Sequence, residues 1–116
     1  MLTFKPDIKI YICTGYTDMR KGANSLSMLA ESILARKVCS GALFVFRGKR
    51  ADKIKLLWWD GQGFCLFYKC LDSGKFVWPK GGDTGSLGIT RGQLSMLLEG
   101  MEWRNPKWSQ PPLYTS

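Results

Sequence analysis

Four apolar runs follow one another so closely in the middle of the chain that their short connections restrict the fold more than any other feature does. The runs are rich in aromatic residues and cover Ala42–Arg47, Lys53–Trp59, Phe64–Cys70 and residues 75–78. Turn sequences such as Asp60-Gly61-Gln62-Gly63 separate them, and glycine in such turns can adopt positive φ angles. Connections of this length join antiparallel strands, because a parallel crossover takes a dozen or more residues. The region therefore predicts an antiparallel meander of four strands.

Two helices and two further strands are predicted around this meander. Alternating isoleucines predict a strand over residues 7–13, and an i, i+3, i+4 stripe of apolar residues predicts a helix over residues 24–37. Ser86–Ile89 is expected to be a short edge strand. Thr90 then opens a capping-box sequence, which predicts a helix over residues 91–99 that ends at a glycine.

Together these elements predict a single domain of the α+β class. The chain has 116 residues, which suits one domain, since domains typically take about 100–200 residues. We expect an antiparallel β-meander sheet of about five or six strands, packed by the two main helices. The domain is expected to span residues 1–103, and residues 104–116, which contain three prolines and Trp108, are expected to form a C-terminal tail.

Positive charge is concentrated in one segment of the chain. Lysine and arginine number 17 against 9 acidic residues, a formal net charge of +8. The densest cluster lies on a predicted hairpin and consists of Arg47, Lys49, Arg50, Lys53 and Lys55. Such a cluster can neutralise nucleic-acid phosphates, and nearby aromatic residues (Trp59, Phe64, Phe67 and Tyr68) can in principle stack on unpaired bases. The alternative is a solvated hairpin tip above an ordinary aromatic core.

A second cationic segment lies between the first predicted strand and the first predicted helix. Arg20 and Lys21 occur there in a polar turn that begins with Thr17 and Asp18. Amide donors and cations beside a helix start can bind an anion. The alternative is a plain connection in which Asp18 caps the helix and Gly22 relieves backbone strain.

The composition argues against an enzyme and against a metal or cofactor site. The chain contains no histidine, which excludes Ser-His-Asp and Cys-His catalysis and metal sites with histidine ligands. Its four cysteines form no Cys-x-x-Cys pair, so we expect free thiols. Most acidic residues fall at predicted turns or caps. No apolar run is long enough to span a membrane and no signal-peptide stretch begins the chain, so a cytoplasmic protein is expected.

Several ordered blocks of the sequence resemble one family closely. The blocks are residues 17–22, 43–50, 52–64, 76–79 and 97–100, with Trp103 after them. They resemble the small Orf-two (TnpB-type) accessory protein of IS-sixty-six bacterial insertion sequences. The resemblance implies a cytoplasmic protein that is encoded beside a separate transposase and assists transposition. It supplies no catalytic residues, and the family's recurrent Asp18, Arg20 and Lys21 and its basic hairpin match the two cationic segments.

These observations favour an accessory factor of DNA transposition that is not itself an enzyme. Arg47, Lys49, Arg50, Lys53 and Lys55 are expected to contact DNA, with Arg20 and Lys21 as a second patch, while the transposase supplies the chemistry. The alternative is a protein-interaction module that binds the transposase or another element-encoded protein without touching DNA. In that case the aromatic sheet, Trp103 and Trp108 would form the contact.

Overall fold

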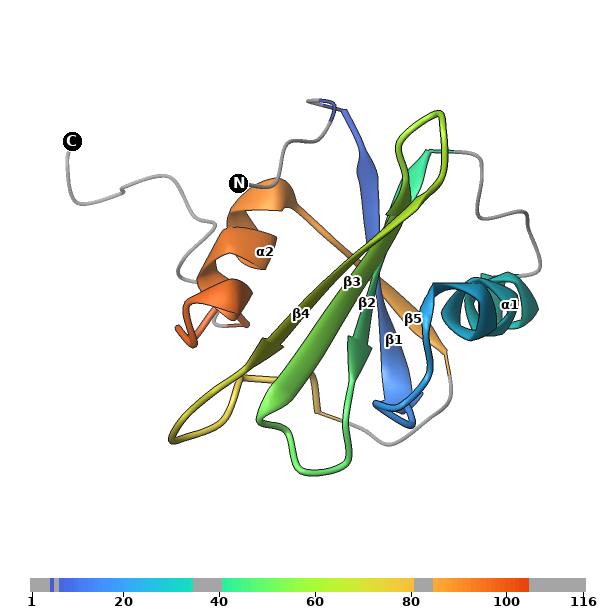
Figure 1. Ribbon diagram of the computed structural model, residues 1–116. Helices are drawn as coiled ribbons and strands as arrows, with labels where there is room; N and C mark the ends of the chain where they lie inside the picture. Colours follow the sequence, from blue (N-terminus) through green and yellow to red (C-terminus); the bar gives the residue numbers. More distant parts are fainter. Residues whose placement is uncertain (1–4, 6, 35–40, 81–84, 105–116) are drawn as a thin grey trace, which may run out of the picture.

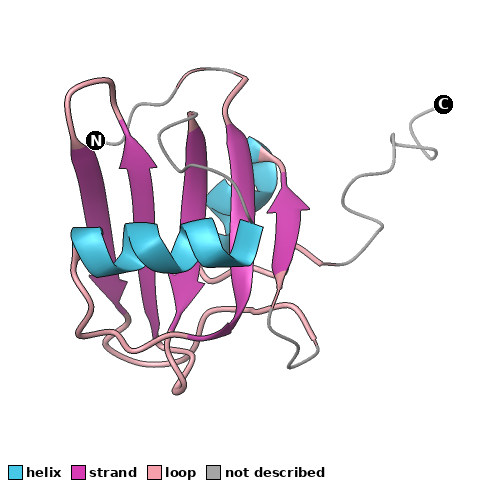
Figure 2. Cartoon of the chain, turned by 90° about the vertical axis from the view of Figure 1, so that its right-hand side faces the viewer, coloured by secondary structure: helices cyan, strands magenta, loops and turns pink. Residues whose placement is uncertain are grey.

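A five-stranded sheet with one helix on each face forms the centre of the molecule (Figures 1 and 2). The computed structural model describes residues 5, 7–34, 41–80 and 85–104. In chain order the elements are β1 (Lys9–Tyr16), α1 (Ala23–Leu34), β2 (Ala42–Arg47), β3 (Lys53–Trp59), β4 (Phe64–Cys70), β5 (Ser86–Ile89) and α2 (Arg91–Leu98). Across the sheet the strands are ordered β4-β3-β2-β1-β5. The predicted α+β class with two main helices is confirmed.

The first three strands of the predicted meander have the bounds expected from the sequence. β2 pairs antiparallel with β3, and β3 pairs antiparallel with β4. Unlike these neighbours, β1 runs parallel to β2, because α1 carries the chain across one face of the sheet between them. β5 closes the other side, antiparallel to β1. The sheet is therefore mixed, with one parallel pair in an otherwise antiparallel arrangement.

The expected fourth strand of the meander, over residues 75–78, is wrong. This segment has no strand pairing, and the backbone N–H of Phe76 donates instead to the carbonyl of Ala51 at 2.9 Å. The indole Nε1 of Trp78 donates to the same carbonyl at 3.2 Å. Both aromatic rings are buried, at 3% and 6% exposure. The segment is thus held across the β2–β3 hairpin by one backbone and one side-chain hydrogen bond and by the burial of its two aromatic rings, without strand pairing.

Alternation along the strands divides the core between the two faces of the sheet. Toward α2 lies a cluster of apolar side chains that includes Ile12, Val45 and Leu56. Toward α1 lies a second cluster that includes Phe44 and Leu57. Because β2 is buried on both faces, it reads in the sequence as a continuous apolar run rather than an alternating one.

Both helices begin close to where the sequence predicts. α1 begins at Ala23, and its described part ends at Leu34; residues 35–37 of the predicted helix lie outside the described residues. The capping box of α2 is confirmed. The Thr90 hydroxyl accepts from the backbone N–H of Gln93, and the Gln93 side-chain oxygen accepts from the backbone N–H of Thr90. At the other end of α2 the Nζ of Lys69 donates to the carbonyl of Leu98 at 2.8 Å.

Candidate nucleic-acid interface

The two cationic segments singled out in the sequence lie side by side at one end of the sheet. Because β1 and β2 are parallel, the loop that follows β1 and the hairpin that follows β2 leave the sheet at the same end, the lower one in Figure 1. The backbone N–H of Thr17 donates to the carbonyl of Arg47 at 2.8 Å, which joins the loop to the hairpin. The side chain of Met19 also packs over Gly48, where an added Cβ would lie 2.9 Å from the Met19 Cγ.

We call this surface the basic end and define it by the side chains of Arg20, Lys21, Arg47, Lys49, Arg50 and Lys53. Most of these side chains are open to solvent: Arg20, Lys21, Lys49 and Arg50 are exposed, and Arg47 and Lys53 are half-buried. Two carboxylates, Asp18 and Asp52, lie among them. The basic end therefore carries a net positive charge contributed by segments about 30 residues apart in the chain.

Lys55 does not belong to this surface, although the sequence grouped it with the hairpin cations. Its side chain is only 6% exposed, and its Nζ donates to the backbone carbonyl of Lys21 at 2.8 Å. The same ammonium lies 4.8 Å from the centre of the Tyr68 ring. Lys55 projects from β3 under the loop after β1, so it fastens that loop to the sheet. The structure thus places the Lys55 ammonium against the protein, where it was expected to face DNA phosphates.

Arg47 is held between two aromatic rings. Its guanidinium carbon lies 4.8 Å from the centre of the Tyr16 ring and 5.2 Å from that of Trp78. Cation–π contacts of this kind are worth about 0.5–2 kcal/mol each, depending on how well they are desolvated. Partial burial lowers the pKa of Arg47 from its usual value, but a guanidinium keeps its charge at neutral pH. The arginine is therefore both a fixed cation and part of a stack that runs from the core to the surface.

The loop after β1 is shaped by a short ion pair. Asp18 accepts from the Arg20 backbone N–H at 2.9 Å and from its guanidinium at 2.9–3.3 Å. These hydrogen bonds lower the pKa of Asp18 to about 2. Asp18 thus orders the loop through Arg20, while the Arg20 side chain stays 91% exposed.

The hairpin between β2 and β3 turns through a backbone conformation that is unusual for its residue. Ala51 has a φ of +68°, in the left-handed region, and its N–H donates to the carbonyl of Gly48 at 3.3 Å. The carbonyl of Ala51 accepts from both Phe76 and Trp78, which fixes this conformation. Lys49 and Arg50 occupy the two positions between Gly48 and Ala51, so the turn presents both cations to solvent.

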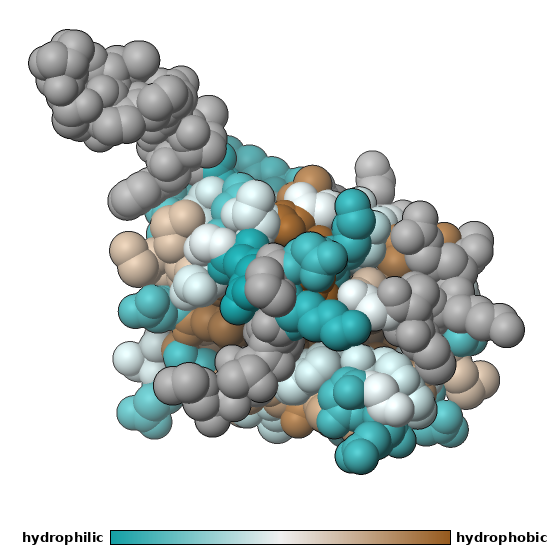
Figure 3. All heavy atoms as spheres, turned by 90° about the horizontal axis from the view of Figure 1, so that it is seen from above, coloured by the Kyte–Doolittle hydropathy of each residue, from teal (hydrophilic) through white to brown (hydrophobic). Residues whose placement is uncertain are grey.

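Of the four aromatic residues expected to stack on bases, only Tyr68 lies beside the basic end, with its ring 4.8 Å from the Lys55 ammonium. Trp59 and Phe64 pack edge to face, with ring centres 5.1 Å apart, where β3 and β4 meet at the opposite end of the sheet. Figure 3 views the molecule from that opposite end, where hydrophilic and hydrophobic side chains are interspersed. Phe67 packs against the core on the α2 side, and only Tyr68 is well exposed.

Tyr16 is a second exposed aromatic residue at the basic end, and sequence reasoning missed it. It is the last residue of β1, is 65% exposed, and pairs in register with Arg47. The available signal was its position directly before the cationic loop, but the break in strand alternation that turns its ring outward is not visible in the sequence.

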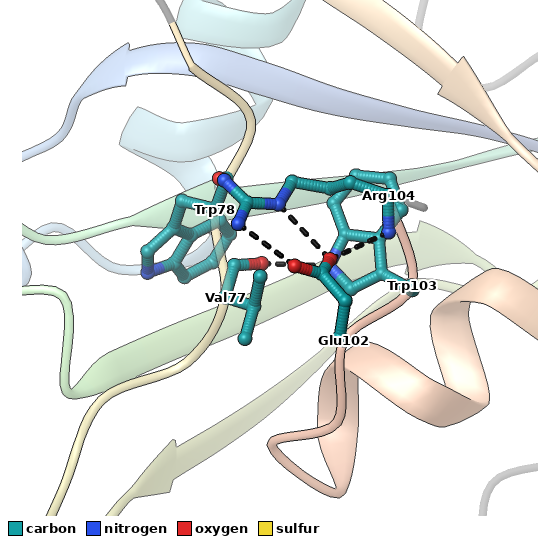
Figure 4. Close-up of polar contacts among 5 residues, drawn as sticks. All are labelled: Val77, Trp78, Glu102, Trp103 and Arg104. Atoms are coloured by element: carbon teal, nitrogen blue, oxygen red, sulfur yellow. Dashed lines mark hydrogen bonds and ion pairs between the residues drawn. The ribbon is translucent and has the colours of Figure 1, made fainter. Parts of the chain in front are cut away.

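Trp103 lies in the core rather than on the surface (Figure 4). It is 4% exposed, and its indole Nε1 donates to the carbonyl of Val77 at 2.6 Å. Next to it, Arg104 donates to the carbonyl of Trp78 and pairs with Glu102 at 2.9 Å. Trp103, expected as a partner contact, therefore packs inside the domain, and the segment after α2 covers residues 77–78. Trp108 lies outside the described residues.

The described cysteines are free and do not form a metal site. Cys13 is buried, which raises the pKa of its thiol to about 12, whereas Cys70 is exposed. Cys39 lies outside the described residues. In the described ranges no three cysteine, aspartate or glutamate side chains lie close enough to hold a metal ion. Neither α1 nor α2 has the length and apolar content of a membrane span.

Comparison with known proteins places the chain in a family. The family model described as "IS66 Orf2 like protein" matches residues 8–108. An uncharacterized protein of Sinorhizobium fredii, y4hO, is 44% identical over 112 residues, which cover 97% of this chain and 96% of that protein. A second protein of the same bacterium, y4jC, is 38% identical over 100 residues, covering 86% and 85% respectively. No solved structure matches significantly. The chain therefore belongs to the IS66 Orf2-like family and is an accessory protein associated with insertion sequences.

Proposed function

We propose that this protein assists transposition by binding DNA phosphates through the basic end, while the transposase supplies the chemistry. The role is non-catalytic and belongs in the bacterial cytoplasm, where the DNA of the element lies. The protein would hold an element end or a target in position. A cationic surface suits this task, because contacts to phosphates position a protein on DNA without reading its sequence.

One observation carries the proposal, namely the convergence of two separate cationic segments on one surface. The Thr17–Arg47 hydrogen bond and the tether from Lys55 to Lys21 hold the loop after β1 against the β2–β3 hairpin. If the positive charge served only solubility, nothing would require it to be gathered at one end and fixed there by a buried lysine. A loop whose backbone is already held in place loses less conformational entropy on binding a phosphate than a free loop does.

The most direct test compares the salt dependence of DNA binding in matched variants. Binding of a short duplex is measured by fluorescence anisotropy over a series of salt concentrations. The logarithm of the binding constant falls linearly with the logarithm of salt concentration, by about 0.9 per phosphate contact for duplex DNA. Replacing Lys49 and Arg50 together by alanine is expected to reduce the steepness of this slope by about 1.8.

A control variant removes the same charge from the opposite end of the molecule. Lys9 and Arg91 are exposed, and they lie at the start of β1 and of α2, away from the hairpin. The Lys9→Ala, Arg91→Ala variant is expected to retain the slope of the unmodified protein. Absence of binding at low salt, or an equal loss in the two double variants, would refute the proposed DNA contact.

Contact with the transposase is a second candidate function. It is favoured by the exposed apolar side chains of Leu66 and Tyr68, which project from β4 at one edge of the sheet. Retention of purified transposase by the immobilised protein, lost in the Leu66→Ser, Tyr68→Ser variant but kept in the Lys49→Ala, Arg50→Ala variant, would support it. Equal retention by all variants would exclude this edge as the contact.

A further inference from the structure

We propose that Tyr16 is a stacking platform for an unpaired nucleobase, and that the basic end therefore binds single-stranded DNA in preference to duplex. The inference rests on the proposed function, because it names the form of DNA that the same surface takes. Its ligand is a single strand whose phosphates meet the cations while one base lies on the tyrosine ring.

The position of Tyr16 at the end of an ordered stack is the first argument. Trp78 is buried and anchored through its indole to the carbonyl of Ala51. The Arg47 guanidinium lies over the Trp78 ring at 5.2 Å and over the Tyr16 ring at 4.8 Å. The series thus runs from a core tryptophan through an arginine to a tyrosine that is 65% exposed. A flat aromatic group from a ligand would extend the series by one member.

The backbone around Tyr16 is fixed on both sides, and the Arg47 guanidinium packs on the ring, so the ring is held before any ligand arrives. The register between β1 and β2 shifts between Cys13 and Tyr16, and this irregularity ends the regular alternation of the strand. The N–H of Thr14 donates to the carbonyl of Gly85 at 2.9 Å, and that of Thr17 donates to the carbonyl of Arg47 at 2.8 Å. An exposed aromatic ring held in this way loses little entropy when a base stacks on it.

Tyr16 also forms one wall of a pocket beside the basic end. The pocket has a volume of about 420 Å³, and side chains of α1, including Leu29 and Ile33, form the facing wall. Volumes of this size, with apolar walls and a few polar groups, are typical of sites for small flat ligands. An unpaired base of a DNA strand can therefore be accommodated in this pocket, next to the Tyr16 ring.

This arrangement discriminates between forms of DNA because a paired base has no free face. In a duplex each base is stacked on its neighbours, and exposing one requires unpairing and unstacking. Phosphate contacts contribute to the binding of both forms, and the binding constant depends on salt concentration to a similar degree for single strand and duplex. Stacking on an aromatic side chain contributes only where bases are already unpaired, and it tolerates any base because every base has a π-face.

The test measures binding of a single strand and of a duplex of equal length by the unmodified protein and three variants. Tyr16→Ala removes the ring, and Tyr16→Phe keeps the ring without the hydroxyl. Met28→Ala removes a side chain of α1 that is exposed to a similar extent, 63%. We expect Tyr16→Ala to weaken single-strand binding by about 5- to 150-fold, while duplex binding changes less than about twofold. Tyr16→Phe and Met28→Ala should bind as the unmodified protein does.

The outcomes separate this inference from the function on which it rests. If neither form binds at low salt, the proposed DNA contact fails and the stacking site fails with it. If both forms bind with a slope that depends on Lys49 and Arg50, but Tyr16→Ala leaves single-strand binding unchanged, only the stacking site is refuted. Equal loss for single strand and duplex, or a Tyr16→Phe variant as weak as Tyr16→Ala, would also overturn it. Thermal unfolding of each variant checks that the fold is retained.

Discussion

Replacing Lys55 by methionine tests whether this residue tethers the loop or contacts DNA. Methionine keeps most of the apolar stem and removes the ammonium. Two interactions are then lost: the hydrogen bond to the carbonyl of Lys21 at 2.8 Å and the contact with the Tyr68 ring at 4.8 Å. A hydrogen bond from a charged donor contributes about 1.5–3 kcal/mol, and a cation–π contact contributes about 0.5–2 kcal/mol.

The net change is smaller than the sum of these two contributions. Lys55 is 6% exposed, so removing its charge also removes the free energy needed to bury an ammonium. We therefore expect the free energy of unfolding to fall by about 2 kcal/mol, which corresponds to a decrease of about 6–12 °C in Tm for a chain of this length.

Urea denaturation measures the stability change, and salt-titrated DNA binding measures the second consequence. Because Lys55 points into the protein, Lys55→Met should leave the slope of binding against salt unchanged wherever the variant is folded. Lys49→Met is the control, since Lys49 is exposed: its stability should stay within about 0.5 kcal/mol, and its slope should fall by about 0.9. A Lys55→Met variant as stable as the unmodified protein, or one whose slope falls as in Lys49→Met, would refute the tether.

Three further changes test separate contacts of the structure. Trp103→Phe should lower the free energy of unfolding by about 1 kcal/mol in urea denaturation, because it removes the hydrogen bond to the carbonyl of Val77; an unchanged stability would contradict that contact. Thr90→Ala should lower it by about 1 kcal/mol, since the cap of α2 is lost, and Thr90→Ser should restore it. The Asp18 carboxylate, titrated by NMR, should have a midpoint near 2 and shift toward 3.8 in Arg20→Gln. Its pKa is depressed in the folded state, so the stabilisation by this ion pair is present above about pH 4 and is lost as the pH falls through 2; a midpoint near 3.8 in the unmodified protein would contradict the pairing.

Local patterns in the sequence were sufficient to predict most of the elements. The strands β2, β3 and β4 were predicted with their observed bounds because a glycine-containing turn sequence separates each strand from the next. The start of α2 was predicted because the capping box of Thr90 is a local signal. By contrast, residues 75–78 have the composition of a strand, but in the structure they pack across the β2–β3 hairpin. Only the fold shows that the carbonyl of Ala51 accepts hydrogen bonds from this segment.

The candidate site could be predicted in part, for a related reason. The sequence identified both cationic segments, but their meeting depends on the parallel pairing of β1 and β2, which involves residues far apart in the chain. The sequence placed Lys53 and Lys55 in one cationic cluster, yet whether each side chain is open or covered is decided by the loop that crosses β3. The sequence likewise favoured a surface position for Trp103 as a partner contact. Its burial follows from the path of the chain after α2.

In the proposed mode of binding, the loop after β1 and the β2–β3 hairpin form one DNA-binding surface. Titration of the isotope-labelled protein with a short DNA strand, followed by backbone amide NMR, tests it most directly. The amide signals of residues 16–22 and 47–53 should shift together with one apparent dissociation constant, while those of residues 60–64 at the opposite end stay in place. Shifts confined to one of the two segments, or centred on residues 60–64, would contradict it.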